Sequence, residues 1–201
     1  MLCFLYGPGE PGRYPAFQLQ SEMTGMKRIA VVGTSCSGKS HFAKRIAGLL
    51  DIPHVELDAL YWDQNWTPKE TDDFRELVEH ATTNSKWACD GNYRAVRDII
   101  WGRVDTIIWL NFPFYVVFGR AIRRTFTRCF RKTKLYSNNH ESFRTSFFSR
   151  DSILLWVGKT YWKHRKDYPK LFDAKEWSHI KVVQLRSPRE AEYFLKEQSA
   201  G

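Results

Sequence analysis

Residues 33–40 read G-T-S-C-S-G-K-S and match G-x-x-x-x-G-K-[ST], the pattern of a phosphate-binding P-loop. In such a loop the glycines let backbone N–H groups close around a polyphosphate. Lys39 would place its charge on the β- and γ-phosphate oxygens, and the Ser40 hydroxyl would bind Mg²⁺. The predicted nucleotide-binding residues here are Gly33, Ser35, Cys36, Ser37, Gly38, Lys39, Ser40 and His41.

The segments before and after this motif have the patterns of a strand and a helix, as a P-loop requires. Residues 27–32 form a short apolar run with β-branched side chains, which is typical of a buried parallel strand. Residues 39–50 place their apolar side chains largely on one helical face, and Pro53 follows the end of that pattern. A Gly/Ser-rich turn that merely carries a lysine is the alternative, but it explains neither flank.

Strand-like and helical patterns alternate along the rest of the chain, which predicts an α/β fold with a parallel sheet and crossover helices. Thr67 and Ser187 are the expected N-caps of the second and last helices. Ligands bind such sheets beyond the carboxyl ends of the strands, so the residues just after each strand are the candidates for function. We expect strands near 27–32, 54–57, 86–89, 105–110 and 180–185, and helices near 39–50, 68–84, from 113, 141–166 and 188–198.

The chain has 201 residues, of which 43% are hydrophobic, and this predicts one domain spanning residues 26–201. Residues 1–25 are rich in glycine and proline and lack the pattern of a secretory signal, so we expect an irregular or disordered arm. No apolar run reaches the roughly 20 residues that span a bilayer. The four cysteines show no metal-ligand spacing, which favours reduced thiols and a cytoplasmic location.

Two aspartates follow predicted strands beside the loop. Asp58 comes after the second strand, where it could accept a proton from a substrate hydroxyl or hold a water on Mg²⁺; a helix or turn cap is the alternative. Asp90 comes after the third strand, where a second acidic residue can order Mg²⁺ together with Ser40. We therefore predict Ser40 and Asp90 as the metal-binding pair.

The same turn carries Arg94, a predicted bidentate partner for a phosphate or carboxylate, with an ordinary surface arginine as the alternative. Residues 61–66 are rich in aromatic side chains, which could stack on a base or pack over the sheet edge. After the last strand, Arg186 and Pro188 form a turn against which an adenine ring could rest.

The formal charge of +9 is concentrated in one stretch, because no acidic residue lies between Pro113 and His140. Arg120, Arg123 and Arg124 share one helical face and could neutralise charge on a transferring phosphoryl group. A basic lid over about 120–140 is one interpretation; a nucleic-acid backbone, a membrane surface or a solvated face are others. The remaining basic residues of the stretch are Arg128, Arg131, Lys132 and Lys134.

The chain resembles the adenylate-kinase-like P-loop kinases, which include shikimate kinases, and is most similar to the bacterial topology modulation proteins. The resemblance covers about 26–198 and implies a P-loop NTPase fold with a five-stranded parallel sheet of order 2-3-1-4-5, with ATP as donor and Mg²⁺ as metal. In adenylate kinases the motif D-G-F-P-R carries the arginine that holds the acceptor phosphate, and Arg94 stands at that position. The matching segments are G-T-S-C-S-G-K-S at 33–40, L-D-A-L-Y-W at 57–62, W-A-C-D-G-N-Y-R at 87–94, D-T-I-I-W-L-N-F-P at 105–113, R-A-I-R-R at 120–124 and L-R-S-P-R-E-A at 185–191.

The sequence departs from the adenylate kinase pattern at Asn92 and Tyr93, and it has W-D-Q-N-W after the second strand instead of a long acceptor-binding insert. AMP is therefore not the expected acceptor. We predict a Mg²⁺-ATP-dependent phosphotransferase for a small molecule, with another nucleotide or a nucleoside as one option, and with Lys39, Asp58, Arg94, Arg120 and Arg124 as catalytic candidates. The alternatives are a nucleotide-dependent protein that binds nucleic acid or affects DNA topology, and a nucleotide-binding module without catalysis.

Overall fold

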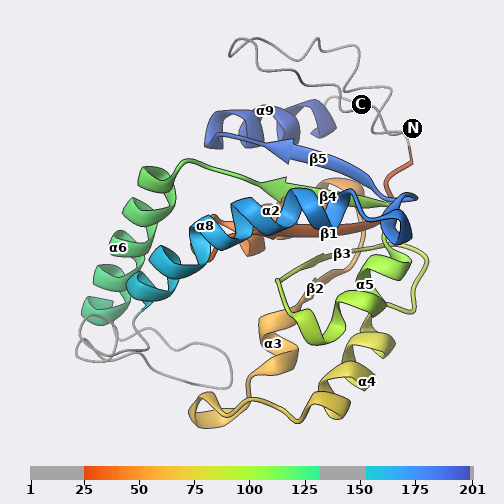
Figure 1. The fold of residues 1–201 in the computed structure, drawn as a ribbon, viewed down its shortest axis with the longest axis horizontal. Helices are drawn as coiled ribbons and strands as arrows, with labels where there is room; N and C mark the ends of the chain where they lie inside the picture. The colour runs from red at the N-terminus through yellow and green to blue at the C-terminus, as the bar shows by residue number, and fades with distance from the viewer. Residues whose placement is uncertain (1–24, 132–152, 200–201) are drawn as a thin grey trace.

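A computed structural model describes residues 25–131 and 153–199 of the chain. At its centre lies a parallel sheet of five strands in the order β2-β3-β1-β4-β5, as the resemblance to the P-loop kinases implies (Figure 1). Each strand begins or ends within one residue of its predicted bounds. The strands are β1 Arg28–Gly33, β2 His54–Glu56, β3 Trp87–Asp90, β4 Thr106–Leu110 and β5 Lys181–Leu185.

The register aligns the carboxyl ends of the central strands. Val31 of β1 lies opposite both Asp90 of β3 and Ile108 of β4, and Gly33 lies opposite Leu110. All residues of β3 and β4 are buried, because helices cover both faces of the sheet. The loops that follow β1, β2 and β3 consequently emerge at one edge.

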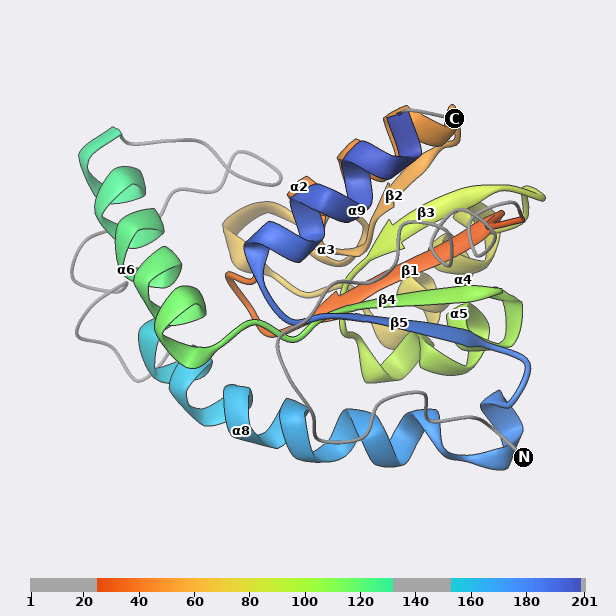
Figure 2. The same cartoon turned by 90° about the horizontal axis from the view of Figure 1, so that it is seen from above.

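Helices form a layer on each side of the sheet, as Figure 2 shows. One layer holds α2 (Lys39–Leu50) and α9 (Pro188–Ser199), which pack on each other. The other holds α4 (Thr71–Ala81), α5 (Arg97–Arg103) and the carboxyl-terminal part of α8 (Ile153–Phe172). Two hydrophobic clusters correspond to these layers, one on each face of the sheet.

The long helix α8 belongs to both layers. Near its start, Val157 and Tyr161 pack in the cluster that includes α2, whereas Tyr168 packs with Trp109 in the opposite cluster. Helix α6 (Phe114–Arg131) follows β4 and packs on α8. Helix α8 therefore passes the end of the sheet where the P-loop lies, and it can contribute side chains to a site there (Figures 1 and 2).

Several sequence expectations need correction. The predicted helix 68–84 begins at Thr71, with Glu70 as its N-cap, so the prediction of Thr67 as the cap is wrong. Residues 67–69 instead fold back on 61–63: Trp62 and Pro68 form an antiparallel bridge, and the Lys69 N–H donates to the Tyr61 carbonyl at 2.9 Å. The short helices α3 (Leu57–Tyr61) and α5 were not predicted, because five and seven residues carry little periodicity.

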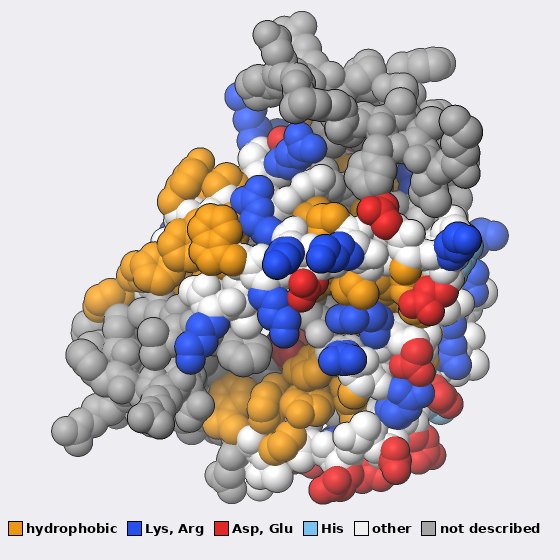
Figure 3. All heavy atoms as spheres, viewed as in Figure 1, with side chains coloured by type: hydrophobic (Ala, Val, Ile, Leu, Met, Phe, Trp, Pro, Cys, Tyr) orange, Lys and Arg blue, Asp and Glu red, His pale blue; other side chains and the backbone are white. Residues whose placement is uncertain are grey.

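The predicted arm 1–25 lies outside the described residues except for Gly25, as do residues 132–140 of the predicted lid and 141–152 of the predicted fourth helix. Figure 3 shows lysine and arginine side chains over α8 and apolar side chains over α6, where Tyr115 is 76% exposed. Within 25–131 and 153–199, no helix is both long enough and apolar enough to cross a bilayer.

Candidate active site

The P-loop lies between β1 and α2, as predicted. Its first position, residue 33, has no room for a side chain. Gly33 has φ 154°, and a Cβ there would lie 2.8 Å from the Leu110 carbonyl oxygen. The Asn92 side chain accepts a hydrogen bond from the Gly33 N–H at 3.3 Å and donates one to the Gly33 carbonyl. Asn92, one of the departures from the adenylate kinase motif, thus ties the turn after β3 to the start of the loop.

Lys39 is the first residue of α2, and its ammonium group lies over the loop, donating to the Thr34 carbonyl at 3.2 Å. Burial lowers the pKa of Lys39 below its usual value, against the opposing effect of the Asp58 and Asp90 carboxylates. Because burial has removed part of the hydration of the Lys39 ammonium group, pairing with an anionic group would stabilise its charged form.

The predicted metal pair is brought together. The Ser40 hydroxyl donates to Asp90 Oδ2 at 2.5 Å, and Asp90 is only 3% exposed. His54 Nε2 lies 2.8 Å from the other carboxylate oxygen, Oδ1. Sequence analysis missed His54, although its place on β2 opposite Ala88 of β3 puts it one strand away from Asp90.

The hydroxyl and carboxylate oxygens of this pair fit Mg²⁺, which commonly takes one or two protein oxygens and completes its shell with phosphates and waters. The Ser37 hydroxyl oxygen is also buried without a hydrogen-bond partner in the described part of the chain. Described side chains form no cluster of three or more His, Cys, Asp or Glu residues that could hold a metal by themselves. A Mg²⁺ ion at Ser40 and Asp90 would take its other ligands from phosphate oxygens and waters.

Of the three predicted arginines on α6, the structure brings Arg120 to the loop. Its guanidinium donates to the Ser37 carbonyl at 2.5 Å and lies over the Phe112 ring, 5.3 Å from the centroid. Burial lowers the pKa of Arg120. Arg123 and Arg124 are exposed, although the Arg124 charge is near enough to lower the pKa of Lys39.

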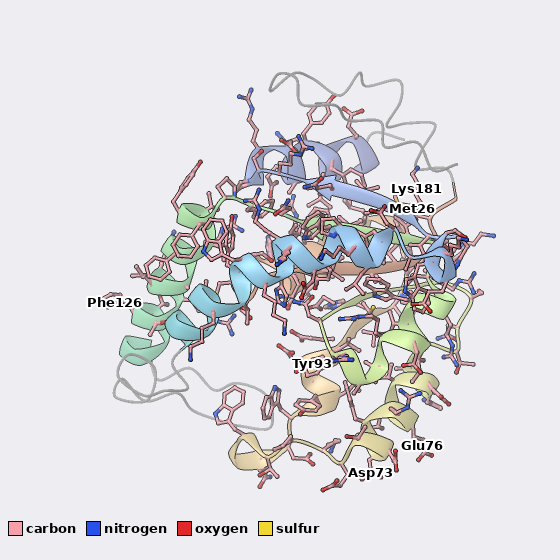
Figure 4. The ribbon with its side chains drawn as sticks, in the orientation of Figure 1. Met26, Asp73, Glu76, Tyr93, Phe126 and Lys181 are labelled. Carbon is pink, nitrogen blue, oxygen red and sulfur yellow. The ribbon has the colours of Figure 1, made fainter. Side chains whose placement is uncertain are left out.

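Asp58 lies on α3 and faces the loop region. The Tyr93 hydroxyl donates to Asp58 Oδ1 at 2.7 Å, and burial, together with this carboxylate, raises the pKa of the Tyr93 phenol. Tyr93 stands between α3 and α5, as Figure 4 shows. Of the aromatic residues 61–66, Tyr61 packs against Tyr93 and Phe74, with ring centroids 4.6 and 5.0 Å apart, so at least this ring supports the site by packing.

A pocket opens beside Tyr93, on the face of the sheet covered by α5 and α8. Arg97 lines this pocket, whereas the predicted acceptor residue Arg94 is exposed and is not one of its lining residues. The residues that surround it are Ala30, Val32, Leu57, Cys89, Gly91, Asn92, Tyr93, Arg97, Ile100, Trp101 and Tyr168.

Helix α8 adds His164, which sequence analysis did not single out. Its Nδ1 is buried without a hydrogen-bond partner in the part of the chain that the structure describes, and its ring lies 5.3 Å from the Tyr168 ring. Burial, followed by the charges of Lys39, Lys163 and Arg97, lowers the pKa of His164 to about 4. The charges of Lys39 and Arg97 both contribute to lowering the pKa of His164, so the three side chains lie near one another.

The other predicted nucleotide contacts lie at the two helices of the opposite layer. His41 is exposed on α2, and Arg186 is exposed before α9. The predicted Ser187 cap is confirmed, because its hydroxyl accepts a hydrogen bond from the Glu190 N–H at 3.1 Å, while Glu190 accepts one from the Arg186 N–H. Pro188 begins α9. The adenine contact of Arg186 and Pro188 stays a prediction from sequence.

The architecture and loop define the P-loop NTPase fold class. Among solved structures, the chain is similar to shikimate kinase from Bacteroides thetaiotaomicron, with TM-score 0.53 and 13% identity over 88% of this chain and 98% of that one. At this identity the likeness supports the fold alone.

Weaker similarities are to a gluconokinase from Sinorhizobium meliloti 1021 (TM-score 0.48, 17% identity, 87% of this chain and 90% of that one) and to shikimate kinase from Aquifex aeolicus VF5 (TM-score 0.49, 14%, 85% and 92%). No protein-family profile and no curated protein matches the chain. The narrower resemblance to topology modulation proteins is therefore without support from these comparisons.

Proposed function

We propose that this protein is a Mg²⁺-ATP-dependent phosphotransferase acting on a small molecule. The observation that carries the proposal is the Ser40–Asp90 hydrogen bond of 2.5 Å beside Lys39, whose ammonium lies over the loop. A hydroxyl, a carboxylate and a lysine grouped at the start of a helix after a glycine-bounded loop suit a nucleoside triphosphate with its metal. The kinase neighbours agree with this function, but their low identity leaves it a proposal.

Each residue then has a task. Lys39 and Arg120 would compensate negative charge on the phosphates, and Ser40 with Asp90 would hold Mg²⁺, which neutralises the β- and γ-phosphate oxygens when bound. The oxygen of the acceptor hydroxyl would attack the γ-phosphorus, and ADP would leave. Asp58 would accept the proton of that hydroxyl. Tyr93 would fix the Asp58 carboxylate through its 2.7 Å hydrogen bond. Arg124 would contribute charge from a greater distance, and the adenine ring would rest near Arg186 and Pro188.

A transfer assay tests this proposal. The protein is incubated with ATP labelled in the γ-phosphate and with a panel of nucleosides, nucleotides, sugars and small acids. We expect label in one compound class, and Asp58→Asn should reduce transfer by about 100-fold or more, since positioned general bases contribute on that order. Asp73→Asn, an exposed change on α4 with the same loss of charge, should behave as wild type. ATP binding without transfer to any panel member would favour the alternative of a module without catalysis.

The comparisons do not support the nucleic-acid alternative. Arg120 does not support it either, because its guanidinium contacts the Ser37 carbonyl and the Phe112 ring. Arg128 and Arg131 have no described side chains, and Lys132 and Lys134 lie outside the described residues. A link to DNA topology and a cytoplasmic location remain predictions from sequence.

A further inference from the structure

His54 forms a hydrogen bond with one oxygen of the Asp90 carboxylate, while Ser40 bonds to the other oxygen. His54 Nε2 lies 2.8 Å from Asp90 Oδ1, and the Ser40 hydroxyl lies 2.5 Å from Oδ2. Because a carboxylate can only accept hydrogen bonds, Nε2 must carry the proton in this contact. Both oxygens of the proposed metal-binding carboxylate are therefore held by protein donors, one from β2 and one from α2.

The alternation of side chains along the strands directs His54 and Asp90 to the same face of the sheet. In the register of β2 and β3, His54 lies opposite Ala88, and Asp90 is two residues beyond Ala88 on the same strand. Side chains two residues apart on a strand point to one face, and Ala88 packs in the hydrophobic cluster that includes α2. His54 and Asp90 consequently share this face with Ser40, the second residue of α2.

Burial makes the His54 contact important for Asp90. The Asp90 side chain is 3% exposed and that of His54 is 19% exposed, so water has little access to replace the imidazole. A buried acceptor that loses its donor costs about 1–3 kcal/mol, and more if it is charged. Without the imidazole, the carboxylate could rotate about its Cβ–Cγ bond, and Oδ2 would no longer be fixed beside Ser40.

The same contact limits how Asp90 can bind a cation. Ca²⁺ takes roughly six to eight oxygen ligands in flexible geometry and binds carboxylates through one or both oxygens, whereas Mg²⁺ needs a nearly ideal octahedron and keeps several waters. With Oδ1 bonded to His54, Oδ2 is the oxygen left for Ser40 and a metal. One oxygen in a fixed direction suits Mg²⁺ and withholds the second oxygen that Ca²⁺ could use.

We infer that His54 is a positioning residue that fixes Asp90 for binding of Mg²⁺ through one oxygen and thereby favours Mg²⁺ over Ca²⁺ in the nucleotide site. The inference rests on the proposed function, because it concerns the metal that accompanies the same nucleotide. His54 itself would not touch the metal. Loss of a hydrogen-bond partner that orients a metal-binding side chain commonly reduces metal affinity by about 10- to 100-fold.

The effect of a metal on nucleotide affinity measures this role without any phosphoryl transfer. The nonhydrolysable analogue β,γ-imido-ATP is titrated calorimetrically into the protein at one fixed pH, in EDTA, in Mg²⁺ or in Ca²⁺. For each metal, the ratio of the dissociation constants without and with that metal gives its coupling to the nucleotide. We expect Mg²⁺ to strengthen binding to the wild-type protein.

The variants isolate the contribution of His54. His54→Leu removes the donor and should reduce the Mg²⁺ coupling by about 10- to 100-fold and the Ca²⁺ coupling by less, while the affinity in EDTA stays unchanged. His54→Gln, whose amide N–H can donate to the same oxygen, should restore most of the Mg²⁺ coupling. His179→Leu is the matched control, because His179 is also half-buried and lies 3.2 Å from an acceptor, the Trp101 carbonyl. It should leave both couplings unchanged.

An unchanged Mg²⁺ coupling in His54→Leu would overturn the inference. An equal loss of affinity in EDTA and in Mg²⁺ would also overturn it, because that pattern indicates a purely structural role. Equal losses of Mg²⁺ and Ca²⁺ coupling would remove the selectivity. Melting by circular dichroism checks the fold of each variant, and His54→Asn, whose side chain is too short to reach Oδ1, replaces His54→Leu if that variant does not fold.

The outcome also separates this inference from the proposed function. If the variants behave as expected but the wild-type protein phosphorylates no compound, the positioning role of His54 is supported and the proposed transfer activity is in doubt. If transfer is observed but His54→Leu keeps the wild-type Mg²⁺ coupling, the proposed function stands and the role of His54 is wrong. If Mg²⁺ does not strengthen nucleotide binding to the wild type, both fail.

Discussion

The Tyr93 hydroxyl donates to Asp58 Oδ1 at 2.7 Å, which joins the turn after β3 to helix α3. This contact holds the proposed general base in one orientation. The pKa of Tyr93 is raised by burial and by Asp58, so the phenol stays protonated and remains a donor throughout the neutral pH range.

Tyr93→Phe should therefore lower kcat for phosphoryl transfer by about 10- to 100-fold, equivalent to the loss of one hydrogen bond to a charged group. The affinity for ATP should change little, because the Tyr93 hydroxyl bonds to Asp58 and not to the loop at 33–40. Tyr115→Phe, at a tyrosine that is 76% exposed on α6, is the matched control. A steady-state assay checks both values, and an unchanged kcat in Tyr93→Phe would remove the positioning role.

Arg120 should matter more than the other arginines of α6, because it alone of Arg120, Arg123 and Arg124 has a hydrogen bond to the loop backbone. Arg120→Lys loses the contact to the Ser37 carbonyl and the stacking on Phe112, so we expect ATP affinity to fall by about tenfold. Arg123→Lys should have a smaller effect. Calorimetric titration with Mg²⁺-ATP gives the two affinities, and equal losses in both variants would contradict the assignment.

Gly91 is a position where the backbone tolerates no side chain. Its φ is 145°, and a Cβ would lie 2.8 Å from Leu57 Cδ1. Gly91→Ala should reduce the free energy of unfolding by about 2–4 kcal/mol, from strain and overpacking together. Gly48→Ala, in helix α2 with open space around it, should instead raise stability by about 0.5–1 kcal/mol. Urea denaturation measures both, and a wild-type midpoint for Gly91→Ala would show that the turn adapts.

His164 makes stability depend on pH in a defined window. Its folded pKa of about 4 lies below the ordinary value of 6.5, so between these values the unfolded chain binds more protons than the folded protein. Stability should thus fall as pH decreases from about 6.5 toward 4, by about 1–2 kcal/mol from this residue after allowance for its partial exposure.

The comparison of two variants isolates this effect from other acidic groups. In His164→Gln the decrease in unfolding free energy between pH 7 and pH 4.5 should be smaller than in wild type, whereas His80→Gln, at an exposed histidine near the end of α4, should keep the wild-type decrease. Parallel curves for His164→Gln and wild type would show that His164 titrates normally.

Part of the site follows from sequence because a parallel sheet gathers the carboxyl ends of its strands. The strand pattern and the loop motif were enough to predict that Asp90 would meet Ser40 and that Asp58 would lie nearby, and both placements agree with the structure.

The contributions of Arg97 and His164 could not be predicted in this way. Arg94 and Arg97 are three residues apart, and their different burial depends on how the chain turns after Gly91 and on the packing of α5 against Trp101. His164 reaches the region only because α8 crosses from one helical layer to the other. Both are consequences of tertiary packing between distant segments, which local periodicity does not encode.

The central claim is that the loop at 33–40 binds a nucleoside triphosphate through Lys39. Calorimetric titration of the protein with ATP in the presence of Mg²⁺ tests it most directly, with Lys39→Ala as the variant and Lys44→Ala, at an exposed lysine of the same helix, as the control. We expect saturable binding to wild type and to Lys44→Ala, and at least about 100-fold weaker binding to Lys39→Ala, the equivalent of roughly 3 kcal/mol. Absence of binding to wild type, or equal affinity in Lys39→Ala, would contradict the account.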